Sequence, residues 1–190
     1  MIPDKKTHKA TITNCLRFEI SEEATKYDKP RYLEIGFDRG YTMHTLAEEF
    51  DTLVGLDNNP MRLSETTKLL KDCDNTELLL GTVESLGSDH WDVVLIDAAH
   101  DYTNVRNDFT HLLELNKADN YTIIFHDYGL IPMCGVKQFV NELFSPEEFQ
   151  KCGEKDNYNP LGGAINDWEA AMVRMTPEFT ERCLDRLSRV

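Results

Sequence analysis

Two short stretches of the sequence carry side chains that could hold a cation or move a proton. In IDAAHDY, Asp97 and His100 stand three residues apart after an apolar run, and in IIFHDYG a second apolar run ends at His126 and Asp127. Two carboxylates and an imidazole, completed by waters or hydroxyl groups, suit an octahedral site for Mg²⁺ or Mn²⁺. We therefore predict a divalent metal at Asp97, His126 and Asp127. His100 is a candidate general base, because an imidazole titrates near neutral pH and neither motif contains a lysine.

The same side chains also have purely structural interpretations, and the sequence leaves both open. Asp97 could cap the turn that follows it, and Asp101 could cap the next helix. His126 could pack in the interior beside a bound ligand. Tyr102 and Tyr128 flank the two motifs and could shape an acceptor pocket, although packing is the commonest role of aromatic side chains.

A third stretch, YLEIGFDRGY at 32–41, is typical of a strand that turns into a helix. Glu34 lies two residues before Gly36, and Gly40 follows four residues later. Turns of this kind that bind a dinucleotide usually carry a further glycine, so that the pyrophosphate can approach the backbone. Here the loop reads Phe-Asp-Arg between the glycines, so it is bulky and carries Asp38 where a phosphate would lie. A cationic sulfonium with an amino-acid tail tolerates Asp38 and Glu34 better than a pyrophosphate does.

Asp57 adds a ribose-binding signal to this corner. It lies 17 residues after Gly40, at the end of the next apolar run. A carboxylate there can accept hydrogen bonds from both hydroxyls of a ribose, a feature that sites for nicotinamide cofactors and S-adenosylmethionine share. Asp57 is therefore compatible with either cofactor, whereas the turn from Glu34 to Gly40 favours S-adenosylmethionine.

The elements that must position these residues alternate between strand and helix. The pattern predicts strands at 31–36, 52–57, 76–81, 91–97, 121–127 and 169–175, and helices at 41–50, from Asn59-Pro60 onward, at 105–113, at 136–143 and after Thr176-Pro177. Two of these strands are apolar throughout, as expected when both faces of a sheet are covered. We therefore predict a doubly wound α/β domain with a mostly parallel sheet. Ligands bind beyond the carboxyl ends of such strands, where Asp57, Asp97 and Asp127 lie.

The composition limits the possible classes of protein. The 190 residues suit one domain, with a lead-in or lid at 1–30, some helix around Glu22 to Lys26, and the binding domain at 31–190. A net charge of −14 disfavours duplex nucleic acid and anionic membranes as partners. The five cysteines form no CxxC pair. Because a signal-peptide core and an apolar run of about 18 residues are both absent, we expect a cytoplasmic protein with reduced thiols.

Taken together, four stretches resemble the class I S-adenosylmethionine-dependent methyltransferases. They read LEIGFDRGYTMHTLA, VGLDNNP, WDVVLIDAAHDYTNVRNDF and IIFHDYG…GVKQFV, and they span roughly residues 30–145. The resemblance is strongest to the branch of macrocin- and macrolide-type sugar O-methyltransferases and cephalosporin-hydroxylase-like proteins. It implies the Rossmann-like methyltransferase fold with a sheet of seven strands.

The resemblance also implies a role for each matching residue. Glu34, Gly36, Phe37 and Gly40 hold the methionyl part of the cofactor, and Asp57 with Asn58 holds the ribose. The turn from Gly81 through Thr82, Val83 and Glu84 flanks the adenine, and Asp97 lies at the methyl end. Two of these assignments have plain alternatives: the two glycines could simply form a tight turn, and Glu84 could be a solvated loop acid.

In the sugar O-methyltransferases that the chain resembles, a metal chelates two neighbouring hydroxyls of the acceptor, and a histidine placed like His100 acts as base. This implies His100 and Asp97 as catalytic residues here. Where some relatives carry a second carboxylate, this chain has His126. That difference weakens affinity for hard cations and shifts the preference toward Mn²⁺ or Fe²⁺, or removes the metal altogether.

Three functions remain open at this point. The first is methyl transfer to a small hydroxylated acceptor, such as a sugar; the second is a methyltransferase-like binding module without catalysis; the third is an NAD-dependent oxidoreductase, which the corner disfavours. The acceptor pocket is expected from the variable loops at 1–30, 128–136 and 153–168, where Gly162-Gly163 suits a mobile lid. None of these loops identifies the acceptor, and the sequence does not indicate an oligomeric state.

Overall fold

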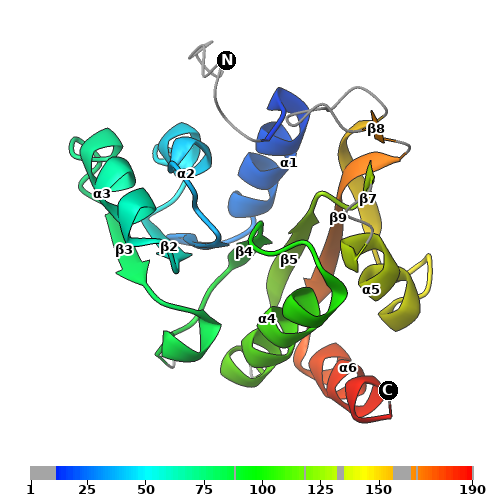
Figure 1. The fold of residues 1–190 in the computed structure, drawn as a ribbon. Helices are drawn as coiled ribbons and strands as arrows, with labels where there is room; N and C mark the ends of the chain where they lie inside the picture. The colour runs from blue at the N-terminus through cyan, green and yellow to red at the C-terminus, as the bar shows by residue number, and fades with distance from the viewer. Residues whose placement is uncertain are drawn as a thin grey trace.

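The computed structural model describes residues 12–87, 89–117, 119–131, 135–155, 164–165 and 167–189 (Figure 1). Within these residues seven strands form one sheet, in the order β3-β2-β1-β4-β5-β9-β7. The strands are β1 (Arg31–Ile35), β2 (Thr52–Asp57), β3 (Thr76–Leu80), β4 (Val93–Ile96), β5 (Tyr121–His126), β7 (Gln150–Lys155) and β9 (Trp168–Met175). A separate pair, β6 (Leu130–Ile131) and β8 (Ala164–Ile165), is antiparallel.

The first five strands of the sheet pair in parallel, whereas β9 runs antiparallel to both β5 and β7. The predicted doubly wound, mostly parallel α/β sheet is therefore confirmed. One consequence matters for the site. Because β9 is reversed, its first residues lie at the edge of the sheet where β1, β4 and β5 end.

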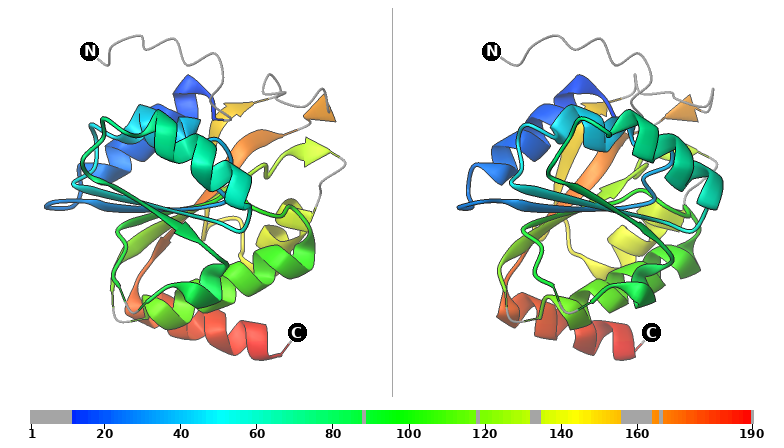
Figure 2. Two further views of the ribbon diagram at one scale, coloured as in Figure 1. Left: turned by 60° about the vertical axis from the view of Figure 1, so that its left-hand side comes forward. Right: turned by 90° about the vertical axis from the view of Figure 1, so that its left-hand side faces the viewer.

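Helices cover both faces of the sheet, as the two views of Figure 2 show. Helices α1 (Asn14–Ala24), α2 (Tyr41–Leu46) and α3 (Pro60–Leu69) lie on one face. Helices α4 (Tyr102–Leu115), α5 (Gly135–Leu143) and α6 (Pro177–Ser188) lie on the other. A short 3₁₀ turn, η1 (Val83–Ser85), follows β3.

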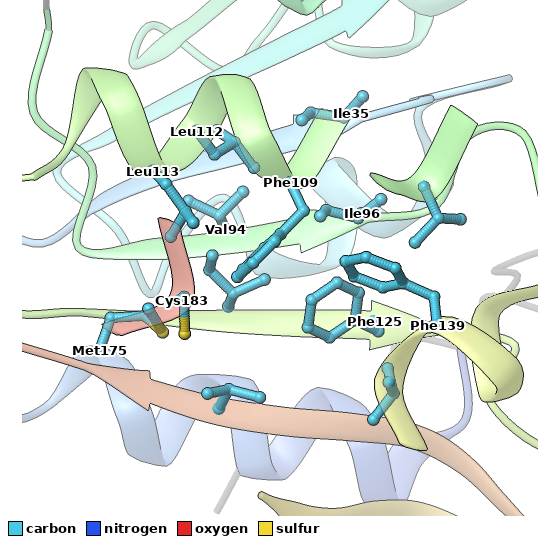
Figure 3. Packing of buried hydrophobic residues seen from close by; sticks show 14 of the residues in the cluster. Ile35, Val94, Ile96, Phe109, Leu112, Leu113, Phe125, Phe139, Met175 and Cys183 are labelled. Atoms are coloured by element: carbon cyan, nitrogen blue, oxygen red, sulfur yellow. The ribbon is translucent and has the colours of Figure 1, made fainter. Parts of the chain in front are cut away.

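Alternation along the strands divides the core between the two faces. In β4, Val94 and Ile96 pack on the α4–α6 side, while Val93 and Leu95 pack on the α1–α3 side. Figure 3 shows the first of these layers, where Phe109 of α4 stacks against Phe125 of β5 with ring centroids 5.5 Å apart. Both faces of β4 and β5 are buried, which explains why their sequences are apolar without alternation, whereas β3 at the edge has no buried residue, so the expectation that both of its faces are covered was wrong.

Three helix starts follow the signals in the sequence. The Asn59 side chain accepts a hydrogen bond from the Met61 backbone and Pro60 opens α3, while Thr176 caps α6 and accepts from Phe179 N. Asp101 caps α4 by accepting a hydrogen bond from Asn104 N, so the capping role considered for it is confirmed. Each cap satisfies a backbone donor that the first turn of a helix leaves unpaired.

The helix expected around Glu22 to Lys26 is present only in part. It is α1, which begins earlier, at Asn14, and ends at Ala24. Its buried residues Leu16 and Ile20 are one turn apart, and α1 packs against β4 and β7. These contacts, rather than local helix propensity, stabilise α1.

The sequence pattern also missed β7, whose residues QKCGEK are mostly polar. Only Cys152 and Gly153 are buried in this strand, which forms by pairing with β9 at the edge of the sheet. Among the described residues, no helix is long and apolar enough to cross a membrane.

Candidate active site

A cavity of about 560 Å³ opens at the edge of the sheet where β1, β2, β4 and β5 end. Most of the residues singled out in the sequence line it. The lining comprises Ile35, Gly36, Asp38, Leu56, Asp57, Asn58, Gly81, Thr82, Val83, Asp97, Ala98, Ala99, His100, Asn104, Asp108, His126 and Asp127. Strand ends far apart in the sequence thus meet around one space, as the parallel topology requires.

The corner after β1 depends on glycine for steric reasons. Gly36 has φ +90°, and a Cβ atom there would lie 2.3 Å from the carbonyl oxygen of Asp97. Both the conformation and the space exclude a side chain, because the atoms in the way belong to the backbone. Gly40, with φ +73°, precedes α2 and packs against the side chain of Thr66. Because these positions are glycines, the backbone that leaves β1 can lie close to the backbone at the end of β4.

Asp57 is held in place by its own surroundings. Its Oδ2 accepts a hydrogen bond from Asp38 N at 3.0 Å, and its Oδ1 accepts one from Asn59 N at 2.8 Å. Two backbone donors therefore fix the carboxylate at the rim of the cavity, with Asn58 beside it. Charge-assisted bonds of this kind are stronger than neutral ones, so the carboxylate is preorganised.

The charge on Asp38, which the sequence argument treated as free, is paired. Arg62 Nε of α3 lies 2.6 Å from Asp38 Oδ1. Asp38 also has φ 42°, an unusual conformation for a residue other than glycine. The ion pair reduces the negative charge that we expected to disfavour a phosphate at this corner. The bulk of the loop is then the main feature that disfavours a dinucleotide.

Four of the predicted cofactor residues do not line the cavity. Glu34 is 1% exposed and accepts a hydrogen bond from Tyr32 Oη at 3.0 Å. Burial, and then the neighbouring Asp97, raise the pKa of Glu34 well above its usual value. Phe37 packs in the core, and Gly40 and Glu84 lie outside the lining. Direct contact of these four with a cofactor stays a prediction.

The histidines and aspartates at the ends of β4 and β5 form one cluster. His100 Nε2 lies 2.6 Å from Asp127 Oδ2 and 3.8 Å from Asp97 Oδ1. His126 Nδ1 lies 2.8 Å from Asp97 Oδ1 and 3.5 Å from Asp127 Oδ1. Two acids and two bases from separate strands thus share one corner of the cavity.

The charges in this cluster shift one another's pKa values. The nearby carboxylates of Asp127, at 2.6 Å, and then of Asp97, at 3.8 Å, raise the pKa of His100 to about 9. Burial opposes ionisation of Asp127, but His126 and His100 hold the pKa of Asp127 far below its usual value. His100 is therefore protonated at neutral pH in the absence of a cation, whereas the sequence argument assumed a pKa near neutrality.

The three predicted metal ligands converge. Asp97, His126 and Asp127 each offer a ligand atom, and these atoms lie within 4.8 Å of one another. Asp127 has φ 57°, so a residue with a side chain occupies a left-handed conformation at this point. Such strain is found most often at functional sites. The geometry fits a divalent cation with an imidazole and carboxylate donors, which suits Mn²⁺ or Fe²⁺ as well as Mg²⁺.

Sequence reasoning missed three polar residues at this site. Asn104 and Asp108 line the cavity from the first two turns of α4. Asn104 and Asp108 are four residues apart in the helix that Asp101 caps, so they lie on the same helix face. This spacing is a signal in the sequence that could have identified them. Burial, and then Glu84 and Asp101, raise the pKa of Asp108 to about 6. The third residue, Glu169, lies behind His126.

Comparison with known proteins supports the fold. No family model matches the chain, and no curated protein matches it. Solved structures do match: a cofactor-bound protein from MTB has a TM-score of 0.62 at 15% identity, covering 85% of this chain and 78% of the other. An O-methyltransferase from Bacillus cereus in complex with SAH has a TM-score of 0.60 at 16% identity, covering 85% and 78%.

A third similar structure is the O-methyltransferase TomG from Streptomyces achromogenes in complex with SAM. Its TM-score is 0.60 at 17% identity, and the match covers 85% of this chain and 77% of TomG. The seven-stranded, mostly parallel sheet flanked by helices is the one that these proteins share, so the chain has the Rossmann-like methyltransferase fold. At such low identity the likeness concerns the fold alone.

Proposed function

We propose that this protein is an S-adenosylmethionine-dependent methyltransferase that methylates a hydroxyl oxygen of a small acceptor, such as a sugar or related metabolite. The observation that carries the proposal is the cavity itself. It places a preorganised carboxylate, Asp57, and the cluster of Asp97, His100 and Asp127 on the walls of one space. The first is suited to a ribose, and the second to a hydroxyl group that must lose a proton.

The cofactor assignment follows the order of the strand ends. Asp57 and Asn58 at the end of β2 take the ribose, and the turn at Thr82 and Val83 after β3 takes the adenine. Gly36, after β1, leaves space for the methionyl part beside Asp97. The sulfonium then lies toward β4, next to the acidic cluster. The negative charge of Asp97 beside this position favours a positive sulfonium.

Asp97, His126 and Asp127 would hold a divalent cation, whose chemistry is to lower the pKa of an acceptor hydroxyl. Positive charge beside Asp97 and Asp127 also opposes the effect of these carboxylates on His100. With such a charge in place the pKa of His100 would be lower than about 9, which would favour the neutral imidazole that a base requires.

His100 removes the acceptor proton in this mechanism. It lines the cavity from the β4–α4 loop, and Asp127 Oδ2 at 2.6 Å orients its ring. Asp97 Oδ1 faces both imidazoles, at 3.8 Å from His100 Nε2 and 2.8 Å from His126 Nδ1. Loss of a positioned base typically slows a reaction by about 10²- to 10⁴-fold. The variant His100→Ala should therefore bind the cofactor normally and lose turnover.

The decisive experiment is a calorimetric titration with S-adenosylmethionine and, separately, with NAD. It is followed by a screen of sugars, catechols and small metabolites for methyl transfer, with and without Mg²⁺ or Mn²⁺. Binding of S-adenosylmethionine together with transfer supports the proposal. Binding without transfer to any acceptor would instead favour a methyltransferase-like binding module, and preference for NAD would favour an oxidoreductase.

The resemblance to macrocin-type sugar O-methyltransferases motivates sugars as the first acceptors to test. Parts of the loops expected to form the acceptor pocket, including Gly162 and Gly163, lie outside the described residues.

A further inference from the structure

Glu169 is a buried carboxylate that lies directly behind His126. It is the second residue of β9, whose antiparallel pairing with β5 sets Ala170 opposite His126. The Glu169 side chain is 0% exposed, and its Oε1 lies 3.5 Å from His126 Nε2. The other ring nitrogen, Nδ1, points to Asp97 and Asp127 in the cavity. His126 therefore lies between one carboxylate behind it and two in front of it.

The surrounding backbone is built to hold this carboxylate. Glu169 Oε1 accepts a hydrogen bond from Thr13 N at 2.8 Å, and Oε2 accepts one from Glu154 N at 3.1 Å and one from the Thr13 hydroxyl. Gly153 has φ +79°, and a Cβ atom there would lie 2.4 Å from Glu169 Oε2. The irregularity in β7 between Cys152 and Lys155 thus makes room for the side chain.

These contacts fix Glu169 with little freedom to move. A buried carboxylate is costly unless hydrogen bonds satisfy it, and here the start of α1 and the bulge of β7 both donate to it. An ionised carboxylate can only accept hydrogen bonds. A hydrogen on His126 Nε2 is therefore favoured by Glu169, which faces that nitrogen at 3.5 Å, just as Asp97 at 2.8 Å favours one on Nδ1 when no cation is bound.

We propose that Glu169 is a positioning residue, which holds the Nε2–H of His126 and so directs Nδ1 to the cation site with Asp97 and Asp127. Histidines that bind metals commonly donate their second ring nitrogen to a carboxylate, which sets the tautomer and the ring orientation. The inference rests on the metal site within the proposed function. Thr13, which caps α1, supplies two of the hydrogen bonds that hold Glu169.

The test compares Glu169→Gln with wild type and with Thr13→Val as a matched control. Glu169→Gln keeps the size of the side chain but removes the charge that favours Nε2–H. Thr13→Val removes the hydroxyl group, which loses one hydrogen bond to Glu169 and the cap of α1. It leaves the Glu169 carboxylate facing His126. Mn²⁺ binding is measured by calorimetry on the full chain. Histidine side-chain nitrogens are followed by ¹⁵N NMR in the metal-free protein.

We expect Glu169→Gln to lower Mn²⁺ affinity by about 10- to 100-fold, the usual effect of losing such a partner. Thr13→Val should lower thermal stability with less than about a threefold change in Mn²⁺ affinity. S-adenosylmethionine affinity should be unchanged in both variants. Equal Mn²⁺ affinity in wild type and Glu169→Gln would overturn the proposal.

The NMR measurement keeps the inference testable even if Glu169→Gln does not fold or the wild type does not bind Mn²⁺. In wild type, His126 Nε2 should carry a hydrogen, with the ¹⁵N shift of a protonated ring nitrogen. An unprotonated Nε2 in the wild-type protein would refute the positioning role without any variant. Because this readout needs neither metal nor methyl transfer, its failure is distinguishable from failure of the proposed function.

Discussion

Protonation of His100 should stabilise the fold at neutral pH and cease to do so in mild alkali. In the folded protein its pKa is about 9, against an ordinary value of 6.5, because the carboxylates of Asp127, at 2.6 Å, and then of Asp97, at 3.8 Å, favour the protonated ring. The difference of roughly 2.5 pKa units, at about 1.36 kcal/mol each, corresponds to about 3 kcal/mol. The His100 side chain is 24% exposed, so solvent screens the interaction only in part.

The sign follows from linkage. A folded pKa above the unfolded one means that the folded protein binds the proton more tightly, so protonation stabilises the fold. The full contribution of His100 is present below about pH 6.5 and is lost as the pH rises through about 9. The acid limb is separate, because the pKa of Asp127 is lowered and its contribution is lost only at much lower pH.

The assay is urea unfolding in EDTA at about pH 6 and about pH 9.5, for wild type and His100→Gln. Between about pH 6 and about pH 9.5 the free energy of unfolding of wild type should fall by about 3 kcal/mol more than that of the variant. Titrations of other groups affect both proteins equally and cancel in the comparison. His44→Gln is the matched control, because His44 lies on α2 and does not line the cavity. Parallel curves for wild type and His100→Gln would refute the ion pair between His100 and Asp127.

Three further predictions concern the cofactor, the corner and the metal. Asp57→Ala should weaken S-adenosylmethionine binding by on the order of 2–4 kcal/mol in calorimetry, and unchanged binding with an intact fold would show that the ribose assignment is wrong. Gly36→Ala forces a Cβ into the backbone of Asp97, so we expect a loss of about 1–3 kcal/mol in urea unfolding together with weaker cofactor binding; a variant as stable as wild type would contradict the steric argument. Exhaustive EDTA treatment should abolish methyl transfer, and Mg²⁺ or Mn²⁺ should restore it, whereas full activity after chelation would leave Asp97 and Asp127 without a metal role.

The sequence was sufficient to predict the convergence of Asp97, His126 and Asp127. Apolar runs mark the strands, and most strands that alternate with helices pair in parallel, as the five from β3 to β5 do here. Their carboxyl ends then lie at one edge, so residues that follow different runs meet there. The caps at Asn59, Asp101 and Thr176 were readable for a related reason, because a cap depends on residues within one turn.

Features that depend on contacts between distant residues could not be predicted in this way. The pairing of Arg62 with Asp38 joins helix α3 to the loop after β1, and nothing in either stretch indicates it. Strand β7 is polar and exists because β9 offers it an edge. The pKa of His100 likewise depends on a distance of 2.6 Å to a carboxylate from another strand, which no local pattern specifies.

Glu169 is an example of a residue whose strand could be predicted from the sequence but whose position at the site depends on the tertiary structure. The strand at 169–175 was predicted correctly, but only the carboxyl ends of strands were searched for functional residues. The chain reverses β9, and this brings the beginning of that strand, with Glu169, to the edge where the others end. Strand identity is determined locally by side-chain hydrophobicity, whereas strand direction is determined by packing and pairing across the whole sheet. Local sequence therefore determined the strands and the residues at their ends, and tertiary pairing decided which of those residues face one another.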